Sequence, residues 1–485
     1  MSLELPAIDP ENLTLVGTPP SQHRFTCQED YNRMETTDPK TPSAADTRLN
    51  RRSFIRTTGV AAAMAGGLEG ILAARQAPAF AQGTKLHWVR WVDFIPESDV
   101  ELKRQMPEAS KALGAEIVLE TINGNDLQPR ITAAIQSGSG ADIFLFQYNW
   151  AHLYQNSVVD VSDVSEPIGK AEGGFYDVFN AGSKVGGKWL AAPHSIVGNA
   201  VAYRRSWLKE VGANEPPKTW DEARKIFSAL KKKGKPYGQT LGHTFGDAPT
   251  FTYPMLWAFG GAETDQTGKK VVINSKGAID SVKFMQAFWK ECCDEGGLAW
   301  DDTNNNRAFH AGEISGTLNG ASIYIVAKRQ KDKIKDDKGE PLWTDIDHYI
   351  LPAGPAGQFT MYLPHSHAVM KYSKNPKLAK DFLKWVQAKE NYEKWFNTQE
   401  AYSVGATHAW ENVPMWSKVD KPLQMFRLAG RNTRIFGHAG PATAKATEAF
   451  TKYIVTDMYA KAVQGMKAED AVKWAEGELK KVYES

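Results

Sequence analysis

Cysteine is scarce in this sequence, and long hydrophobic runs are missing. Only three of the 485 residues are Cys. Cys292 and Cys293 are neighbours in a helical pattern, where adjacent side chains point about 100° apart, so a disulfide between them would be strained. No zinc-type spacing accompanies them. The uncharged stretch between Arg56 and Glu69 is only twelve residues long, short of the roughly 20 that a membrane-spanning helix needs. These features argue against a disulfide framework and a permanent membrane anchor.

An excess of charge of one sign is also missing, since Lys plus Arg is 58 and Asp plus Glu is 56. This balance gives no reason to expect nucleic acid or an anionic membrane surface as a partner. The catalytic patterns G-x-S-x-G, H-E-x-x-H, G-x-G-x-x-G and C-x-x-C are missing as well. His365 and His367 share one face of a predicted strand, but the spacing places no third metal ligand. We therefore expect neither a cofactor nor a metal, and an exported enzyme stays as a remote alternative.

What the sequence does contain is a chain long enough for two domains and rich in aromatic rings. Its apolar residues (42%) and charged residues (24%) give it the composition of a soluble globular protein. Fifteen Trp, 16 Tyr and 21 Phe make up 11% of the chain. Large cores use such flat apolar faces, and so do sugar-binding sites.

Residues 50–81 have the three parts of a secretory signal. Asn50-Arg51-Arg52-Ser53-Phe54-Ile55-Arg56 resembles a twin-arginine motif, an Ala/Gly-rich stretch follows, and Ala79-Phe80-Ala81 is a small-x-small cleavage site. We expect export through the twin-arginine pathway, cleavage after Ala81 and a periplasmic mature protein. Residues 1–49 are polar and predict disorder. Met34 lies 17 residues before Arg51 and is an alternative start of translation.

The first part of the mature chain alternates strand and helix patterns. A capping box, Ser98-x-x-Glu101, opens the first helix, and Pro107 inside it predicts a kink or break. The βαβαβ order predicts an α/β fold with a mostly parallel sheet flanked by helices. The predicted strands are 86–92, 116–122 and 143–146, and the predicted helices are 98–113 and 127–136.

The ends of these three strands carry polar and aromatic side chains. In open α/β sheets, ligands bind beyond the carboxyl ends of the strands. The segments that leave the strands are 91–94, 123–126 and 147–150. From them we expect the ligand to be held by Trp91, Asp93, Phe94, Asn123, Gln147, Tyr148 and Trp150.

The rest of the chain is richer in predicted helices. Residues 216–222 contain a second capping box, Thr219 with Glu222, before an amphipathic helix. We expect Trp220, inside this motif, to be structural. Pro376 stands at the first position of another helix. Further helices are predicted at 252–259, 276–295, 307–315 and within 442–483.

Six short motifs between residues 85 and 483 resemble those of the extracellular solute-binding proteins of ABC importers, the sugar-binding family that includes maltose-binding protein. Three details depart from the family pattern: Asn156-Ser157 replaces a usual glycine, Arg204-Arg205 replaces Asn-Lys, and Ala321-Ser322 follows Asn319-Gly320 where an aromatic residue is usual. The motifs occur in the family's order, at 141–161, 187–205, 216–222, 309–320, 351–355 and 463–471.

The resemblance implies the two-lobed periplasmic-binding-protein fold, in which a hinge closes two α/β lobes around the ligand. We expect lobe one at 82–195 and 355–410, and lobe two at 196–354 and 411–485. The resemblance also implies a monomer that delivers its ligand to the membrane permease subunits of an ABC importer. The further ligand-binding candidates that it suggests are Asn199, Trp257, Asn319, Tyr362 and His365.

The chemistry of these candidates favours a neutral polyhydroxyl ligand, a sugar or polyol. Such a ligand needs aromatic faces for its C–H surface and planar polar groups for its hydroxyls. An amino acid, a polyamine and a phosphorylated polyol remain alternatives. A cationic ligand would need several convergent carboxylates, whereas the candidate segments offer Asp93 with Asp126 nearby. A phosphate would need Arg or Lys in the cleft.

Overall fold

A computed structural model of the chain describes residues 83–431 and 433–485. Contacts divide the chain into residues 1–62 and 63–485, and every described residue belongs to the second unit. The predicted signal segment and the predicted disorder of 1–49 lie outside the described residues, as does Cys27. Cys292 and Cys293 are both buried free thiols.

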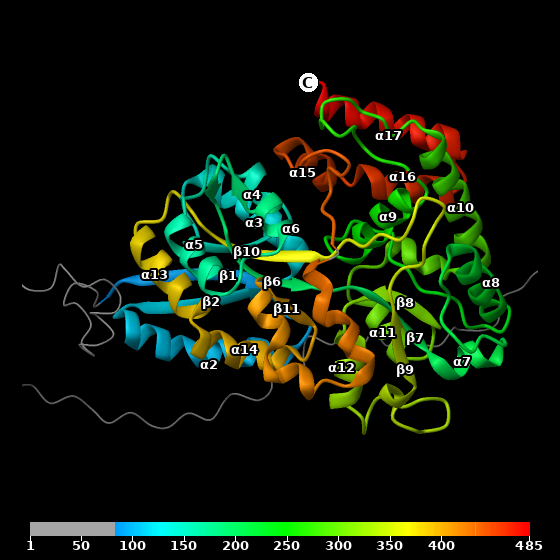
Figure 1. Cartoon of the computed structure of the whole chain (residues 1–485), viewed down its shortest axis with the longest axis horizontal. Coiled ribbons are helices and arrows are strands. Elements are labelled where there is room, and N and C mark those ends of the chain that lie inside the picture. The colour runs from blue at the N-terminus through cyan, green and yellow to red at the C-terminus, as the bar shows by residue number, and fades with distance from the viewer. Residues whose placement is uncertain (1–82, 432) are drawn as a thin grey trace, which may run out of the picture. The chain divides into compact units, whose positions relative to one another are not determined.

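Six strands form the larger sheet. They are β1 Lys85–Trp91, β2 Glu116–Ile122, β3 Ile143–Gln147, β6 Ala192–Val197, β10 Leu363–Val369 and β11 Ser403–Gly405. Their order in the sheet is β11-β6-β10-β3-β1-β2 (Figure 1). β1 pairs in parallel with β2 and β3. β10 is antiparallel to both β3 and β6, and β6 is antiparallel to β11.

The α/β fold is confirmed, but the expectation of mostly parallel sheets is wrong, because the larger sheet is mixed. Helices connect β1 to β2 and β2 to β3, and such crossovers make neighbouring strands parallel. β10 instead enters the sheet from a much later part of the chain and runs against β3. The local hydrophobic pattern that identified the first three strands holds no information about the direction of a returning strand.

The smaller sheet also departs from the prediction. It consists of β7 Ala200–Arg204, β8 Gly316–Asn319 and β9 Ile346–Tyr349. The order is β8-β7-β9, and both pairs are antiparallel. β7 follows β6 after only Gly198 and Asn199, so the chain passes from one sheet to the other within two residues.

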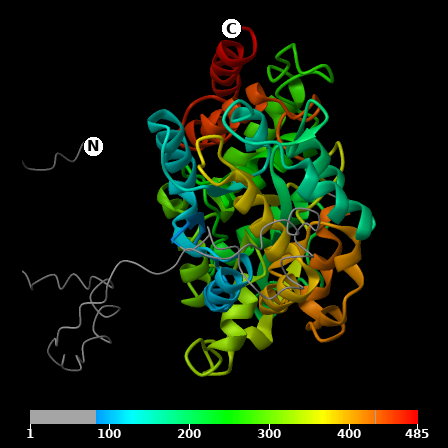
Figure 2. The same cartoon turned by 90° about the vertical axis from the view of Figure 1, so that its left-hand side faces the viewer.

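Helices cover both faces of the larger sheet. They are α2 Pro96–Leu113, α3 Gly124–Ser137, α4 Trp150–Leu153, α5 Ser162–Ala171, α6 Asp177–Gly182, α13 Pro376–Gln387 and α14 Lys389–Gln399, with a hairpin of β4 Lys184–Val185 and β5 Lys188–Trp189. Figure 1 shows α2 and α14 below the strands and α3, α5 and α6 above them. α13 and α14 both pack on α2, and Figure 2 shows their gold ribbons beside the blue one of α2.

α2 begins two residues earlier than predicted, and the predicted capping box does not open it. Pro96 occupies its first position, and the Ser98 hydroxyl has no hydrogen-bond partner among the described residues. The carboxylate of Asp99 instead accepts the backbone N–H of Asp93 at 2.9 Å, which ties the end of β1 to the first turn of the helix. The helix continues unbroken through Pro107.

The smaller sheet is surrounded by the remaining helices. They are α7 Arg205–Glu210, α8 Trp220–Lys231, α9 Asp247–Ala258, α10 Lys276–Cys292, α11 Asn304–His310, α12 Ser322–Arg329, α15 Ala444–Thr451, α16 Ile454–Val463 and α17 Ala468–Tyr483. Near the C-terminus, α16 packs on α9 and α10, and α17 packs on α10. Short 3-10 helices complete the described chain: η1 Glu295–Ala299, η2 Leu342–Asp345, η3 His408–Asn412, η4 Pro414–Ser417 and η5 Lys421–Arg431.

The capping box that opens α8 is confirmed. The Thr219 hydroxyl accepts the N–H of Glu222 at 3.2 Å, and the Glu222 carboxylate accepts the N–H of Thr219 at 3.3 Å. Trp220 is buried against Phe251 and Phe288, as its structural role predicts. Pro376 likewise stands at the start of α13, as expected.

We call the part built on the larger sheet lobe one and the part built on the smaller sheet lobe two. The chain crosses from lobe one to lobe two between β6 and β7. It returns between β9 and β10, and crosses again between β11 and α15. The exact residue boundaries of the lobes stay a prediction.

Candidate functional site

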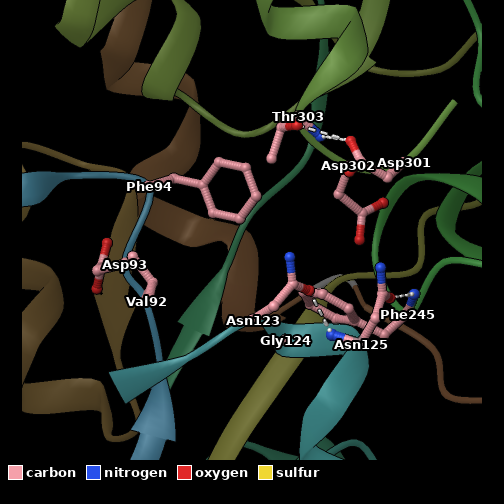
Figure 3. A pocket seen from close by; sticks show the side chains of 10 residues that line it. All are labelled: Val92, Asp93, Phe94, Asn123, Gly124, Asn125, Phe245, Asp301, Asp302 and Thr303. Carbon is pink, nitrogen blue, oxygen red and sulfur yellow. Dashed lines mark hydrogen bonds between the residues drawn. The ribbon is translucent and has the colours of Figure 1, made fainter. Parts of the chain in front are cut away.

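A cavity of about 270 Å³, the wide cavity, lies where the ends of β1 and β2 meet loops of lobe two (Figure 3). Lobe one contributes residues 92–94 and 123–125, which directly follow the two strands. Lobe two contributes Phe245 and the loop 301–303. The wide cavity therefore lies at the edge of the sheet where the sequence placed the ligand.

The neighbouring residues Phe94 and Asp93 point in opposite directions. In Figure 3 the ring of Phe94 extends into the cavity, whereas the carboxylate of Asp93 is turned away from it. That carboxylate accepts a side-chain N–H of Gln399 at 3.1 Å and lies 3.4 Å from a guanidinium nitrogen of Arg90. Burial raises the pKa of Asp93, and the positive charge of Arg90 opposes this rise. The structure thus places the carboxylate inside lobe one.

Asn123 presents its side-chain nitrogen to the wide cavity. Its Oδ1 accepts the N–H of Asn125 at 2.9 Å and so caps α3. The amide nitrogen points into the open space in Figure 3. Asn125 in turn accepts the backbone N–H of Phe245 at 3.2 Å, which is a hydrogen bond between the lobes.

Phe245 forms the lobe-two wall that both cavities share. Its ring lies on Gly124, where a Cβ would stand 2.2 Å from the ring atom Cε1. The ring also meets that of Trp91, with 5.5 Å between the centroids. The hydroxyl of Tyr148 donates to the Phe245 carbonyl oxygen at 2.9 Å. Together with Asn125, these residues of lobe one hold this single residue of lobe two.

A second cavity of about 20 Å³, the narrow cavity, adjoins the wide one. The two share Phe94, Phe245 and Asp302. The structure brings four predicted binding residues to the narrow cavity, namely Trp91, Phe94, Asn199 and Asn319. The sequence did not single out the others that line it: Val197, Phe245, Gly246, Asp247, Asp302, Gly320, Leu363 and Tyr402.

Two buried aspartates of lobe two, Asp247 and Asp302, line the narrow cavity. Asp302 accepts the backbone N–H of Gly246 at 3.1 Å and that of Asp247 at 2.8 Å. Asp247 accepts a side-chain N–H of Asn305 at 2.7 Å and one of Asn319 at 3.4 Å. Burial raises the pKa of Asp302 to about 6. Burial, together with the charge of Asp302, raises the pKa of Asp247 well above its ordinary value.

The described residues that line the two cavities include acidic side chains but no basic ones. Among the described residues that line them, none is a lysine, an arginine or a histidine. Neutral donors alone stabilise the carboxylates of Asp247 and Asp302. A buried carboxylate without a counter-charge favours a ligand group that donates hydrogen bonds or carries positive charge, and it disfavours a phosphate.

Tyr402 lines the narrow cavity from lobe one and is only 3% exposed. Its ring is roughly parallel to that of Trp91, at 23° and 6.4 Å between centroids. The two residues before it, Glu400 and Ala401, have φ of 44° and 82°, a backbone region that L-residues adopt at a cost. Such strain is often found near functional sites. The structure thus holds the Tyr402 ring at the cavity despite this cost.

The third predicted segment, 147–150, does not line either cavity. Gln147 is fully buried in β3. The hydroxyl of Tyr148 donates its hydrogen bond to the carbonyl oxygen of Phe245. The backbone of Tyr148 has a positive φ of 49°. Trp150 is 2% exposed and packs on Phe146. This segment therefore contributes to the core and to the contact between the lobes.

Three candidates suggested by the family resemblance are buried and line neither cavity. Trp257, in α9, is 3% exposed and contacts Tyr253 and His438. Tyr362 is buried just before β10. His365, in β10, meets the ring of Trp91 with 4.5 Å between centroids, so it supports a cavity wall from behind. Within the described residues, no group of three or more His, Cys, Asp or Glu is arranged to hold a metal ion.

Residues 108–418 match the family model described as bacterial extracellular solute-binding protein. This match covers more than half of the chain. The chain belongs to this family. It is thus a member of a family of binding proteins rather than of enzymes.

Curated relatives of this solute-binding protein are distant and match in part. A protein of Deinococcus radiodurans named "Probable ABC transporter-binding protein" is 25% identical over 255 residues, which are 51% of this chain and 58% of that protein. A binding protein of Brucella abortus is 22% identical over 285 residues, which are 55% of this chain and 64% of that protein. Each match spans less than two thirds of the relative's length.

Solved structures with the same fold match over nearly their whole length. Maltose-bound MalE3 of T. maritima is 18% identical, with a TM-score of 0.69 over 82% of this chain and 99% of that one. A solute-binding protein of Agrobacterium radiobacter K84 in complex with ribitol is 18% identical, with a TM-score of 0.66 over 83% and 99%. These likenesses confirm the two-lobed fold of the solute-binding protein. Over the residues that the structure describes, no helix has both the length and the apolar character to span a membrane.

Proposed function

We propose that this solute-binding protein captures a sugar or polyol between its lobes and, as a monomer, delivers it to the permease subunits of an ABC importer. One observation carries the ligand class: flat rings and hydrogen-bonding groups from both lobes line two adjoining cavities that share three residues. The rings of Trp91, Phe94 and Phe245 offer surface for the C–H face of a sugar. Amide and carboxylate groups offer partners for its hydroxyls.

The amides come from both lobes, as a closing cleft requires. Asn123 belongs to lobe one, Asn319 ends β8 of lobe two, and Asn199 lies at the crossing between the sheets. Asn199 donates a 2.8 Å hydrogen bond to the Thr250 hydroxyl, which fixes the orientation of its amide and leaves Oδ1 on the other side. A ligand that joins these groups favours the closed arrangement of the lobes, because it contacts both at once.

The comparisons support this proposal. The Deinococcus radiodurans relative is named for an ABC transporter, and the fold neighbours were solved with maltose and with ribitol. A phosphorylated polyol or an amino acid would bring an anion to cavities where no described lining residue is cationic. A polyamine would meet the carboxylates of Asp247 and Asp302, and it therefore belongs in the test.

A thermal-shift screen of the protein against sugars, polyols, amino acids and polyamines tests the ligand class. A ligand at 100 times its dissociation constant adds about 2.7 kcal/mol to the free energy of unfolding. We expect hits among sugars or polyols. Hits confined to amino acids or to polyamines would overturn the proposed ligand class, and turnover of a hit compound would overturn the binding role.

Removal of the aromatic walls tests the site. Phe94→Ala and Phe245→Ala should each raise the dissociation constant of the hit about tenfold or more, because each removes one apolar face of the cavity. Phe284→Ala is the matched control, since Phe284 lies in α10, which lines neither cavity. The control should lower the melting temperature without changing the dissociation constant.

We also propose that the chain reaches the periplasm through the twin-arginine pathway. The support is the sequence around Arg51 and Arg52, followed by the small-x-small site at 79–81. Replacing both arginines by lysine keeps the charge but removes the twin-arginine motif. We expect the double variant to accumulate as uncleaved precursor in the cytoplasm, as measured by cell fractionation. Normal export of the variant would contradict the pathway.

A further inference from the structure

The narrow cavity has the size of a single small group. Its volume of about 20 Å³ is enough for one water-sized group, since such a group needs about 10–15 Å³. It shares three lining residues with the wide cavity, so a ligand whose body lies in the wide cavity can extend one substituent into the narrow one. The identity of that substituent is decided by the groups around the narrow cavity.

Those groups are negative or electron-rich. Asp247 and Asp302 are 6% and 5% exposed, and the groups that donate hydrogen bonds to them are neutral amides and backbone N–H groups. Among the described residues that line the narrow cavity, none carries a positive charge. A charge taken out of water without a partner costs several kcal/mol. The missing counter-charge is therefore a strong selective feature of this cavity.

Tyr402 is an independent observation that points to a ligand. Its side chain is 97% buried and lines the cavity, yet its hydroxyl has no hydrogen-bond partner among the described residues. Burial raises the pKa of Tyr402, and the charges of Asp93, Asp247 and Asp302 add to this rise in that order. A ligand group between Tyr402, Asp247 and Asp302 would meet two carboxylates and a hydroxyl oxygen, which are three hydrogen-bond acceptors.

The remaining walls are aromatic. Trp91, Phe94 and Phe245 enclose the same space, and a π face attracts a cation that lies against it. Three acceptors match the three N–H groups of a primary ammonium, whereas a ligand hydroxyl has only one proton to donate. A ligand phosphate would meet two carboxyl groups and, among the described lining residues, no cation.

We propose that the polyhydroxyl ligand carries a primary ammonium group, which binds in the narrow cavity between Asp247, Asp302 and Tyr402. The ligand is thus an amino sugar or amino polyol. This inference rests on the proposed function, which supplies the polyhydroxyl body in the wide cavity. The inference adds the ammonium group of the ligand, which sets the specificity of the site.

Matched pairs of probes test the ammonium. Glucose is compared with glucosamine and with N-acetylglucosamine, which keeps the nitrogen but loses the charge, and sorbitol is compared with 1-amino-1-deoxysorbitol. Titration calorimetry on the full chain at pH 7 should show at least one amine that binds about tenfold tighter than its neutral partners. Spermidine and NaCl serve as cation probes without a sugar body.

Proton release gives a second readout. Burial raises the pKa of Asp302 to about 6, so a cation bound beside it should expel protons from the aspartate pair. At pH 6 the measured binding enthalpy of the amine should therefore change with the ionisation enthalpy of the buffer. The enthalpy of a neutral sugar should not.

Variants locate the ammonium. Asp247→Asn and Tyr402→Phe should each reduce the ratio of the affinity for the amine to the affinity for its neutral partner about tenfold. Asp280→Asn is the charge-matched control, because Asp280 is on the exposed side of α10 and pairs with Lys276. It should leave the preference unchanged.

The outcomes separate this inference from the proposed function. Neutral sugars that bind as tightly as their amines would overturn the ammonium and leave the sugar-binding function standing. An amine preference that survives in both Asp247→Asn and Tyr402→Phe would overturn the location. Binding of spermidine or sodium alone, or of none of the probes, would overturn the polyhydroxyl ligand and with it both proposals.

Discussion

The ring of Phe245, in lobe two, rests directly on the backbone of Gly124, in lobe one, with room for no side chain between them. A Cβ on residue 124 would come within 2.2 Å of Cε1 and 2.3 Å of Cζ of that ring. Gly124 is the first residue of α3, a position at which alanine is well tolerated for helix formation. The glycine is therefore required by the contact between the lobes rather than by the helix.

Gly124→Ala should weaken ligand binding without destabilising the protein. The added methyl group displaces the Phe245 ring and so disturbs the shared wall of both cavities, and we expect the dissociation constant to rise about tenfold. Alanine favours the helix by up to about 1 kcal/mol, so the melting temperature of the ligand-free protein should stay constant or rise. Calorimetric titration and thermal unfolding measure the two effects. A fall in melting temperature with unchanged affinity would contradict this account.

The sequence could predict this edge of the sheet because the evidence for it is local. The strand and helix patterns between residues 85 and 147 identify β1, β2 and β3, and parallel strands bring their carboxyl ends together. Phe94 and Asn123 therefore line the wide cavity as expected. Asp93 does not face it, because successive side chains along an extended backbone point to opposite sides. This alternation can be read from the sequence, and it argues against the prediction that both Asp93 and Phe94 bind the ligand.

The remaining residues of the site, most of them in lobe two, could not be predicted in the same way. Phe245, Asp302 and Tyr402 lie in segments without a periodic hydrophobic pattern, and only tertiary contacts bring them to the cavities. Asp247 has a weak local signal, since it is an acidic residue in the first turn of α9 after Gly246. Nothing in the sequence indicates that Asp302, from a distant loop, will accept its N–H.

Tyr148→Phe should show how much the hydrogen bond between the lobes contributes to ligand affinity. The variant removes the hydroxyl that donates to the Phe245 carbonyl oxygen at 2.9 Å. A neutral hydrogen bond contributes about 1 kcal/mol, so the dissociation constant should rise about fivefold. Tyr154→Phe is the matched control, because its hydroxyl bonds to Thr132 within lobe one at 3.0 Å. Equal affinities of the two variants would show that Tyr148 does not stabilise the closed lobes.

Asp247→Asn should stabilise the ligand-free protein increasingly as the pH rises. The pKa of Asp247 is raised in the folded state by burial and by the charge of Asp302. The folded state therefore binds this proton more tightly than the unfolded state, so wild-type stability is highest below the unfolded pKa near 3.8 and falls as the pH rises above it. Asparagine removes this loss, which amounts to at most about 1.4 kcal/mol per pH unit for one proton.

Urea denaturation of wild type and Asp247→Asn between pH 4 and pH 8 measures the difference. The gap between their free energies of unfolding should widen with pH in favour of the variant. Asp280→Asn, at an exposed ion pair, should show no such trend. A gap that stays constant across the range would mean that Asp247 is not strained by its burial, and it would remove the energetic reason for a cationic ligand group.

Acid should destabilise lobe one through His365, a buried residue of β10. Burial lowers the pKa of His365 to about 3, with the charge of Arg90 acting in the same direction. The unfolded state takes up a proton below about pH 6.5, but the folded state does so only near pH 3, so stability is full above pH 6.5 and falls as the pH drops toward 3. Between pH 7 and pH 5, this one histidine lowers the free energy of unfolding by about 2 kcal/mol.

His365→Phe, of similar size, should reduce the loss of unfolding free energy between pH 7 and pH 5 by that amount. His243→Gln should not reduce it, because the ring of His243 is exposed and Asp457 raises its pKa instead. If the two variants lose equal stability on acidification, the acid sensitivity comes from groups other than His365.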